Sequence, residues 1–231
     1  MPGIIALVPA YNEEARIAPV LEQARIHLPV LVVDDGSTDG TAALAQEMGA
    51  TVIRQVPNQG KGAALCAGFR HAIDSGYEAV VTLDADGQHD PAEIPAFLQA
   101  YSQHPSDLII GARTFSEMPL VRRIANQTGT LAFSWAMGER IPDNQSGYRM
   151  ISRRLMEAML DSGESGFEFE VEMIVTCVQR GYTLDWVPIR TIYAGESSHI
   201  QPWHHLVHFF RVVWQTRQRM RSSRPTPSQT S

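Results

Sequence analysis

The chain has 231 residues, of which 44% are hydrophobic and 19% are charged, and its formal net charge is −6 at pH 7. This composition is typical of a globular enzyme and excludes extended disorder. The negative charge argues against a general nucleic-acid binder, which needs a basic face. The length suits one well-buried domain, or two small halves that share one sheet.

The first half of the chain alternates apolar runs with amphipathic segments. Strands are predicted at residues 4–8, 30–34, 51–55, 79–83 and 108–110. Helices are predicted between them, at residues 13–27, 39–48, 61–75 and 92–101. Continuous apolar strands that alternate with helices indicate an α/β fold with a mostly parallel, twisted sheet and helices on both faces.

The second half is less regular. A long helix at residues 120–137 precedes a loop centred on residues 143–147, and two further helices are predicted from Ser152 to residue 160 and at 168–180. Two short strands, 183–187 and 189–193, are separated by Pro188. A last helix is predicted at residues 203–221, followed by a Ser/Pro/Thr-rich disordered tail at 222–231.

The two cysteines and the N-terminal sequence indicate in which cellular compartment the protein is found. Cys66 and Cys177 lie in apolar helical patterns without the spacing of metal ligands, which predicts buried thiols in a reducing cytosol. The N-terminus lacks the features of a signal peptide. No apolar stretch approaches the roughly 20 residues that span a bilayer. We therefore expect a cytoplasmic protein whose contact with a membrane is confined to its surface.

Two carboxylates follow the fourth predicted strand in the run Asp84-Ala85-Asp86. Loops after the strands of an open α/β sheet meet at its carboxyl edge, where ligands bind. Mg²⁺ and Mn²⁺ prefer such oxygen ligands and complete their shells with water and substrate phosphates. A single Asp-x-Asp is also common in solvated loops. The run thus predicts a metal–diphosphate site that needs support from other loops.

Three other loops follow predicted strands at the same edge. Pro9 to Glu14 offers backbone N–H groups and an aromatic ring to a nucleotide, or is a turn with helix-capping acids. In the second loop, Asp35 suits a base or ribose and Asp39 suits a helix cap. The third loop, residues 58–62, lacks the Lys-Ser/Thr ending of a P-loop, which leaves a backbone turn near the nucleotide.

Taken together, these loops resemble those of the family 2 glycosyltransferases of GT-A fold, and within them the dolichol- or polyprenyl-phosphate sugar synthases. The shared stretches are VPAYNEE (8–14), VVDDGSTDGT (32–41), NQGKGAAL (58–65), LDADGQHDP (83–91), GAR (111–113) and DNQSGYR (143–149). The resemblance implies one GT-A catalytic domain at 1–221. It comprises a Rossmann-like sugar-nucleotide half at 1–113, an acceptor half at 114–202 and an amphipathic helix at 203–221.

The resemblance also implies roles for individual residues. The nucleotide-sugar, UDP- or GDP-linked, should be bound by Pro9, Tyr11, Glu13, Asp35, Asp84, Ala85, Asp86 and Arg113. Divalent Mg²⁺ or Mn²⁺ should be held by Asp84 and Asp86 with Gln88 nearby. Arg113 and Asp143 are the implied catalytic residues: Arg113 approaches phosphate, and Asp143 positions the acceptor or acts as general base. The alternatives are a surface arginine and an Asp that caps a turn.

The segment after the last predicted strand differs in sequence from that of the archaeal lipid-phosphate mannose synthases. Those enzymes carry an Arg and a Lys there, whereas this chain has Ser197-Ser198-His199. His199 is a candidate metal or diphosphate ligand, although a single histidine is often structural. Glu170 is a weaker candidate for organising the site, because an acid in a first helical turn also favours the helix dipole.

The last predicted helix, from Trp203 to Arg221, combines apolar and aromatic residues with arginines near its end. That pattern is typical of a helix at a membrane surface, or of one packed on the domain with solvated arginines. We expect peripheral contact at the inner face of the plasma membrane.

The leading hypothesis is a metal-dependent, inverting transfer of a hexose from a nucleotide-sugar to a polyprenyl phosphate. The alternatives are the same chemistry on a soluble or glycan hydroxyl, a non-catalytic sugar-nucleotide-binding subunit, and a nucleotidyltransferase. The last would need a glycine-rich basic loop after the first strand, which the VPAYNEE stretch does not supply.

Overall fold

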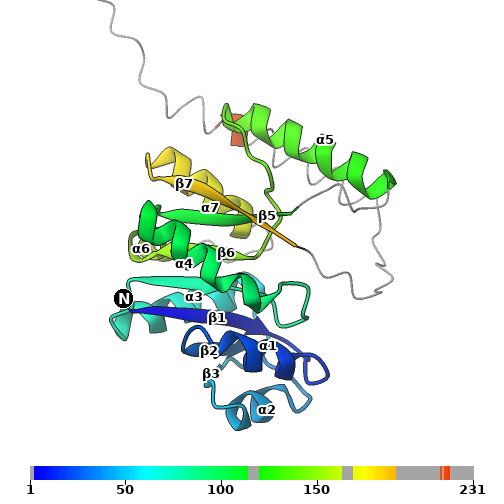
Figure 1. Ribbon diagram of the computed structural model, residues 1–231, viewed down its shortest axis with the longest axis vertical. Coiled ribbons are helices and arrows are strands. Elements are labelled where there is room, and N and C mark those ends of the chain that lie inside the picture. The colour runs from blue at the N-terminus through cyan, green and yellow to red at the C-terminus, as the bar shows by residue number, and fades with distance from the viewer. Residues whose placement is uncertain (1–2, 114–119, 163–168, 191–213, 215, 219–231) are drawn as a thin grey trace, which may run out of the picture. The chain divides into compact units, whose positions relative to one another are not determined.

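The computed structural model describes residues 3–113, 120–162, 169–190, 214 and 216–218 (Figure 1). The chain divides into two compact units, of which the first comprises Met1–Thr114 and Gln145–Ala194, and the second Phe115–Asn144 and Gly195–Ser231. The first unit contains every strand of the described sheet, and the second contains the helix α5 (Leu120–Met137).

A seven-stranded sheet in the order β3-β2-β1-β4-β6-β5-β7 forms the centre of the first unit (Figure 1). All neighbouring strands are parallel except β6, which runs antiparallel to both β4 and β5. This confirms the predicted α/β class with a mostly parallel sheet. The strands are β1 (Ile4–Ala10), β2 (Val30–Asp34), β3 (Thr51–Arg54), β4 (Ala79–Thr82), β5 (Leu108–Arg113), β6 (Arg149–Ser152) and β7 (Leu184–Ile189).

Helices cover both faces of this sheet. On one face, α3 (Lys61–Asp74) packs against α6 (Arg153–Ser162), which in turn packs against α7 (Phe169–Gln179). On the other face lie α1 (Ile17–Ala24), the 3₁₀ turn η1 (Pro91–Glu93) and α4 (Ile94–Gln103), while α2 (Thr41–Glu47) packs beside β2 and β3.

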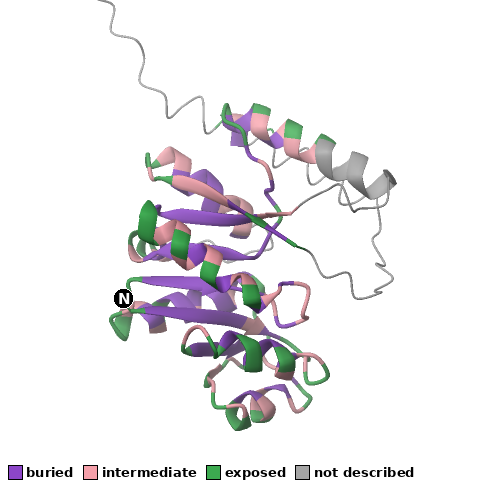
Figure 2. Ribbon diagram, viewed as in Figure 1, coloured by how far each residue is buried: buried purple, intermediate pink, exposed green. Residues whose placement is uncertain are grey.

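The alternating side chains of β1 explain why its sequence is continuously apolar. Ala6 and Val8 share a core cluster with Leu21 of α1. Leu7 points to the opposite face, where a Cβ added to Gly68 of α3 would lie 2.4 Å from Leu7 Cδ1. A strand that is buried on both faces has no position for a polar side chain. Figure 2 shows the central strands buried along their length.

Two strand predictions were wrong. β6 was not predicted, because its four residues were read as the end of a loop and the start of a helix at Ser152. Arg149 in this strand is buried, which no apolar pattern indicates. The break predicted at Pro188 is absent, and β7 continues through it. Within the described part of the chain β7 pairs only with β5, so Pro188 can lie at an edge position that needs no N–H donor.

The first helix begins at Ile17 rather than at Glu13, because the loop before it is bonded elsewhere. The Glu13 N–H donates to Thr41 Oγ1 over 2.8 Å, and Asn12 adopts a left-handed φ of 55°. Asparagine tolerates that conformation better than most residues. Residues 12–14 therefore belong to the loop after β1 and not to the helix.

The other helix predictions agree with the structure within a few residues, and α5 has the predicted bounds. Cys66 and Cys177 are buried thiols, as predicted. Of the predicted helix 203–221 only residues 214 and 216–218 are described, and the predicted tail 222–231 lies outside the described residues. No described helix is both long and apolar enough to span a bilayer.

Candidate functional site

The strand order reverses its direction at β1, which lies between β2 and β4. In open α/β sheets, ligands bind beyond the carboxyl ends of the strands at such a point. A cavity of about 380 Å³ lies there, within the range of small-molecule sites. Its lining residues are Pro9, Ala10, Tyr11, Glu13, Asp35, Asn58, Gly60, Lys61, Ala64, Asp84, Ala85 and Asp86.

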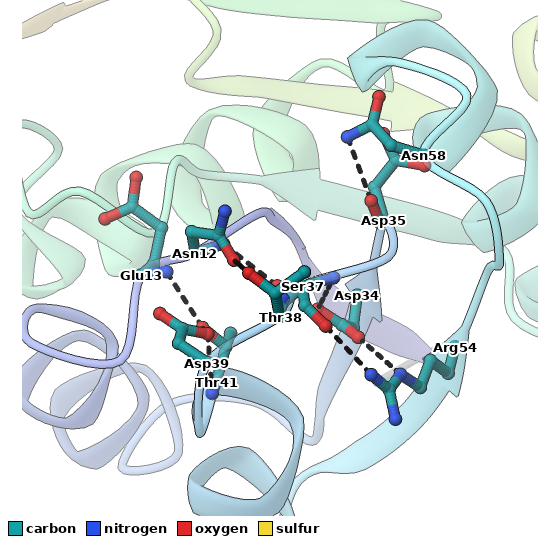
Figure 3. Close-up of polar contacts among 10 residues, drawn as sticks. All are labelled: Asn12, Glu13, Asp34, Asp35, Ser37, Thr38, Asp39, Thr41, Arg54 and Asn58. Carbon is teal, nitrogen blue, oxygen red and sulfur yellow. Dashed lines mark hydrogen bonds and ion pairs between the residues drawn. The ribbon is translucent and has the colours of Figure 1, made fainter.

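The loops after β1 and β2 are joined by hydrogen bonds (Figure 3). The Asn12 N–H donates to Ser37 Oγ over 2.9 Å, and Asn12 Oδ1 accepts the Thr38 N–H over 2.8 Å. Asp39 Oδ1 accepts the Thr41 N–H over 3.0 Å at the start of α2. Gly40 is the N-cap residue itself, so Asp39 assists the cap from one residue earlier. These bonds fix the wall of the cavity that bears Tyr11.

Asp35 holds a third loop against these two. Its Oδ1 accepts the Gln59 N–H over 2.8 Å and its Oδ2 accepts the Gly60 N–H over 2.7 Å. The Asn58 side chain adds a third hydrogen bond between the same two loops by donating to the Asp35 carbonyl over 2.9 Å (Figure 3). Charge-assisted bonds to backbone N–H groups are among the stronger hydrogen bonds in proteins. Asp35 therefore shapes the cavity as well as lining it.

The floor of the cavity contains an ion-pair network around Lys61. Lys61 Nζ lies 2.6 Å from Asp84 Oδ1 and 2.8 Å from Glu170 Oε1. Loss of water around Asp84 would raise its pKa, but the neighbouring groups, Lys61 foremost, together outweigh this effect and lower that pKa. Desolvation likewise would lower the pKa of Lys61, but Asp84 and Glu170 raise it above its ordinary value. Lys61 and Asp84 therefore form a charged pair at neutral pH.

His89 is a neutral side chain that accepts a hydrogen bond from the backbone of Asp84. The Asp84 N–H donates to His89 Nδ1 over 3.0 Å, which assigns the imidazole proton to Nε2. Burial lowers the pKa of His89, and this effect exceeds the attraction of Asp84 for the charged form. The second carboxylate, Asp86, accepts the Gln88 N–H over 2.9 Å. Asp84 and Asp86 are thus held by backbone N–H contacts in and around their own loop.

The start of β6 is tied to the same network. The buried Arg149 donates from Nε to the Ser146 carbonyl over 2.7 Å and from Nη1 to the Glu170 carbonyl. A Cβ added to Gly147 would lie 3.0 Å from Lys61 Nζ and 3.1 Å from Asp84 Oδ2. The backbone at Gly147 therefore contacts the Lys61–Asp84 pair closely, and a side chain there would displace it.

The structure brings seven of the predicted site residues together around one cavity: Pro9, Tyr11, Glu13, Asp35, Asp84, Ala85 and Asp86. Gln88 contacts Asp86 through its backbone N–H, which donates to the Asp86 carboxylate. Arg113 is the last residue of β5 and is not among the residues that line the cavity. Asp143 is buried in the second unit, and His199 lies outside the described residues. The roles assigned to these residues remain predictions.

Lys61 is the main residue that the motif interpretation missed. The stretch around it was rejected as a P-loop, interpreted as a backbone turn near the nucleotide and listed among the shared stretches, but Lys61 itself was given no role. One signal was nevertheless present in the sequence: Lys61 is the only lysine of the chain, and all the other basic residues among the 19 are arginines. Glu170, a weaker candidate, pairs with Lys61.

The donor set fits a divalent cation that shares its shell with a substrate. Among the described residues, no group of three or more His, Cys, Asp or Glu side chains could enclose a metal ion. Asp84 and Asp86 are two of the four carboxylate residues that line the cavity. Mg²⁺ commonly binds to one or two carboxylates, with phosphate oxygens and water as its other ligands. The arrangement fits a cation that is completed by a diphosphate.

Comparison with known families decides the identity of the chain. The model of glycosyl transferase family 2 matches residues 5–160, which include every cavity residue. The chain belongs to glycosyltransferase family 2. This family 2 glycosyltransferase is 32% identical over 212 residues to the undecaprenyl-phosphate mannosyltransferase of Micrococcus luteus, with 84% of this chain and 86% of that protein covered.

Two other relatives extend the comparison. The polyprenol monophosphomannose synthase of Mycolicibacterium smegmatis is 32% identical over 201 residues, which cover 80% of this chain and 76% of that protein. A structure of glucosyl-3-phosphoglycerate synthase from Mycobacterium tuberculosis with Mn²⁺, UDP and phosphoglyceric acid superposes with a TM-score of 0.70 at 20% identity, covering 98% and 80% of the two chains. The GT-A fold of this family 2 glycosyltransferase is thereby confirmed.

Proposed function

We propose that this family 2 glycosyltransferase uses a divalent metal to transfer a hexose, with inversion, from a UDP- or GDP-linked donor to a polyprenyl phosphate. The observation that carries the proposal is the cavity at β1 and β4, where Asp84 and Asp86 meet the loops that suit a nucleoside. Two relatives at 32% identity, named for transfer to undecaprenyl phosphate or polyprenol, support the choice of acceptor.

The donor would occupy the cavity with its nucleoside against Tyr11 and Asp35 and its diphosphate toward Asp84 and Asp86. Mg²⁺ or Mn²⁺ held by these two carboxylates would neutralise the charge that develops on the leaving diphosphate. Lys61 adds a positive charge at the same end of the cavity. The carboxylates, through the cation that they would hold, and Lys61, through its own charge, would thus bind and orient the diphosphate.

The transfer itself needs no nucleophile from the protein. An oxygen of the lipid phosphate, already ionised at neutral pH, attacks the anomeric carbon. The bond from that carbon to the diphosphate oxygen breaks, and the electron pair leaves with the nucleoside diphosphate. One displacement inverts the anomeric configuration. Asp143 would then orient the acceptor and Arg113 would contact phosphate, whereas a hydroxyl acceptor would require Asp143 as general base.

The lipid acceptor requires contact with a membrane, which we assign to the region of residues 203–221 at the cytoplasmic face. Two observations within the second unit support it. The side chains of Trp135 and Trp214 are largely exposed. The Arg217 guanidinium lies 4.7 Å from the centre of the Trp135 ring. Indole and guanidinium groups together are typical of protein surfaces at the membrane interface.

The test is a transfer assay with labelled UDP-glucose, GDP-mannose and UDP-N-acetylglucosamine. Each donor is offered with detergent-solubilised polyprenyl phosphate or with a panel of water-soluble sugars. We expect one donor to give a lipid-linked product that requires Mg²⁺ or Mn²⁺ and is lost in Asp86→Asn. Transfer only to soluble sugars would refute the lipid acceptor, and full activity of Asp86→Asn would refute the metal site. The anomeric configuration of the product, read by NMR, tests inversion.

A further inference from the structure

Lys61 stands apart from every other basic residue of the chain. It is the single lysine, and the other 18 of the 19 Lys and Arg residues are arginines. An arginine presents a planar, rigid fork, whereas a lysine presents a compact charge on a flexible stem. A chain that uses arginine everywhere else therefore has a lysine at the one position beside its carboxylate pair.

The surroundings of Lys61 favour a compact charge that can move. Its ammonium lies between Asp84 Oδ1 and Glu170 Oε1, at 2.6 Å and 2.8 Å. The close approach of Gly147, whose added Cβ would lie 3.0 Å from Nζ, leaves little room for a guanidinium. The side chain is 41% exposed and lines the cavity, so it has open space on its other side.

We infer that Lys61 is a resident counter-ion that occupies the metal site of the free enzyme and leaves Asp84, while keeping Glu170, when a divalent cation binds. The inference rests on the proposed function, because it takes Asp84 and Asp86 to be the metal carboxylates. Lys61 then competes with the metal. Two cations cannot share one carboxylate without repulsion, which is strong where water is partly excluded.

This competition has a consequence for the order of binding. With Lys61 on Asp84, a free divalent cation meets a site whose negative charge is already partly neutralised. The negative diphosphate of a donor restores the charge balance, so the metal binds better together with the donor than alone. Lys61 also pairs with Glu170 at the start of α7. Its release from Asp84 therefore changes the electrostatic environment of a helix that is remote in sequence from the Asp-x-Asp loop.

The single lysine allows a direct test without any substitution. Protein grown with ¹⁵N-labelled lysine carries one labelled side-chain ammonium, which NMR observes as one signal. We expect Mg²⁺ with UDP to shift this signal, and to do so over the same concentration range in which calorimetry records metal binding. A lysine signal that stays unchanged at metal saturation would overturn the inference.

A second test uses the sign of a mutational effect. Lys61→Met should bind Mn²⁺ more tightly than the wild type in the absence of nucleotide, by about tenfold, because a competing charge is removed. Arg153→Met is the matched control, since it removes one positive charge from an ion pair with Glu157 near the opposite edge of the sheet. Mn²⁺ binding that is equal or weaker in Lys61→Met, with a melting temperature showing that it is folded, would contradict the inference.

The proposed metal site and the counter-ion role of Lys61 can be refuted separately. If the wild type and Asp86→Asn bind Mn²⁺ equally, the metal site of the proposed function is wrong. If binding depends on Asp86 while the lysine signal stays fixed and Lys61→Met gains no affinity, only the counter-ion role of Lys61 is wrong.

Discussion

Asp35→Asn should destabilise the loop at residues 58–60 without changing the size of the side chain. Asp35 is only 3% exposed, and each of its carboxylate oxygens accepts one backbone N–H, from Gln59 and from Gly60. An asparagine keeps one acceptor and turns an NH₂ group toward the other N–H. A lost charge-assisted bond is worth about 1.5–3 kcal/mol, and an unpaired buried N–H costs about 1–3 kcal/mol more.

Water reduces this cost, because Gln59 is exposed and its N–H can be hydrated in the variant. We therefore expect a loss of about 2 kcal/mol in the free energy of unfolding, which corresponds to about 4–8 °C in melting temperature for a chain of this size. Gly60 and Lys61 line the cavity, so donor binding should also weaken, by about tenfold at most.

The assay is thermal unfolding together with calorimetric titration of nucleotide. The matched control is Asp74→Asn, an exposed aspartate at the end of α3, which should change the free energy of unfolding by less than about 0.5 kcal/mol. If Asp35→Asn melts as the control does and binds nucleotide normally, the carboxylate does not hold the loop.

Two further predictions concern stability. The pKa of His89 lies below its ordinary 6.5, so the unfolded chain takes up a proton that the folded chain does not. The free energy of unfolding should therefore decrease below about pH 6.5, by up to about 1.4 kcal/mol per pH unit. His89→Asn keeps an acceptor for the Asp84 N–H but has no group that titrates in this range, so it should lose this pH dependence. Urea titrations at pH 7.5 and 5.5 measure the difference. Gly68→Ala places a methyl group 2.4 Å from Leu7 Cδ1. It should lower the free energy of unfolding by about 1–2 kcal/mol, because the cost of overpacking exceeds the gain in helix propensity. Unchanged urea unfolding would mean that α3 can shift outward.

Local patterns predicted the parts of the fold that depend on local properties. The apolar runs of β1, β2 and β4 are long enough to identify strands, and the loop after each strand had to lie at one edge of the sheet. The Asp84 and Asp86 carboxylates were therefore predicted to lie near Tyr11 and Asp35, and all four line one cavity.

The features that were missed depend on contacts between remote residues. β6 is a four-residue strand that exists because β4 and β5 pair with it from both sides. No local pattern reveals that pairing, and a buried Arg149 hides it further. In the same way, the partner of Lys61 in α7 becomes visible only when the sheet and its helices are assembled.

The ion pair between Lys61 and Asp84 changes what the Asp-x-Asp run means physically. Two carboxylates so close together in one loop are usually taken as a ready metal site, yet Asp84 already has a cation 2.6 Å away. A divalent ion that arrives alone must compete with Lys61, since the ion and the ammonium repel each other near one carboxylate. An ion that arrives with a diphosphate brings ligands for itself and negative charge that compensates Lys61. Under the proposed function, this ion pair therefore favours binding of metal and donor as a unit over binding of a free cation.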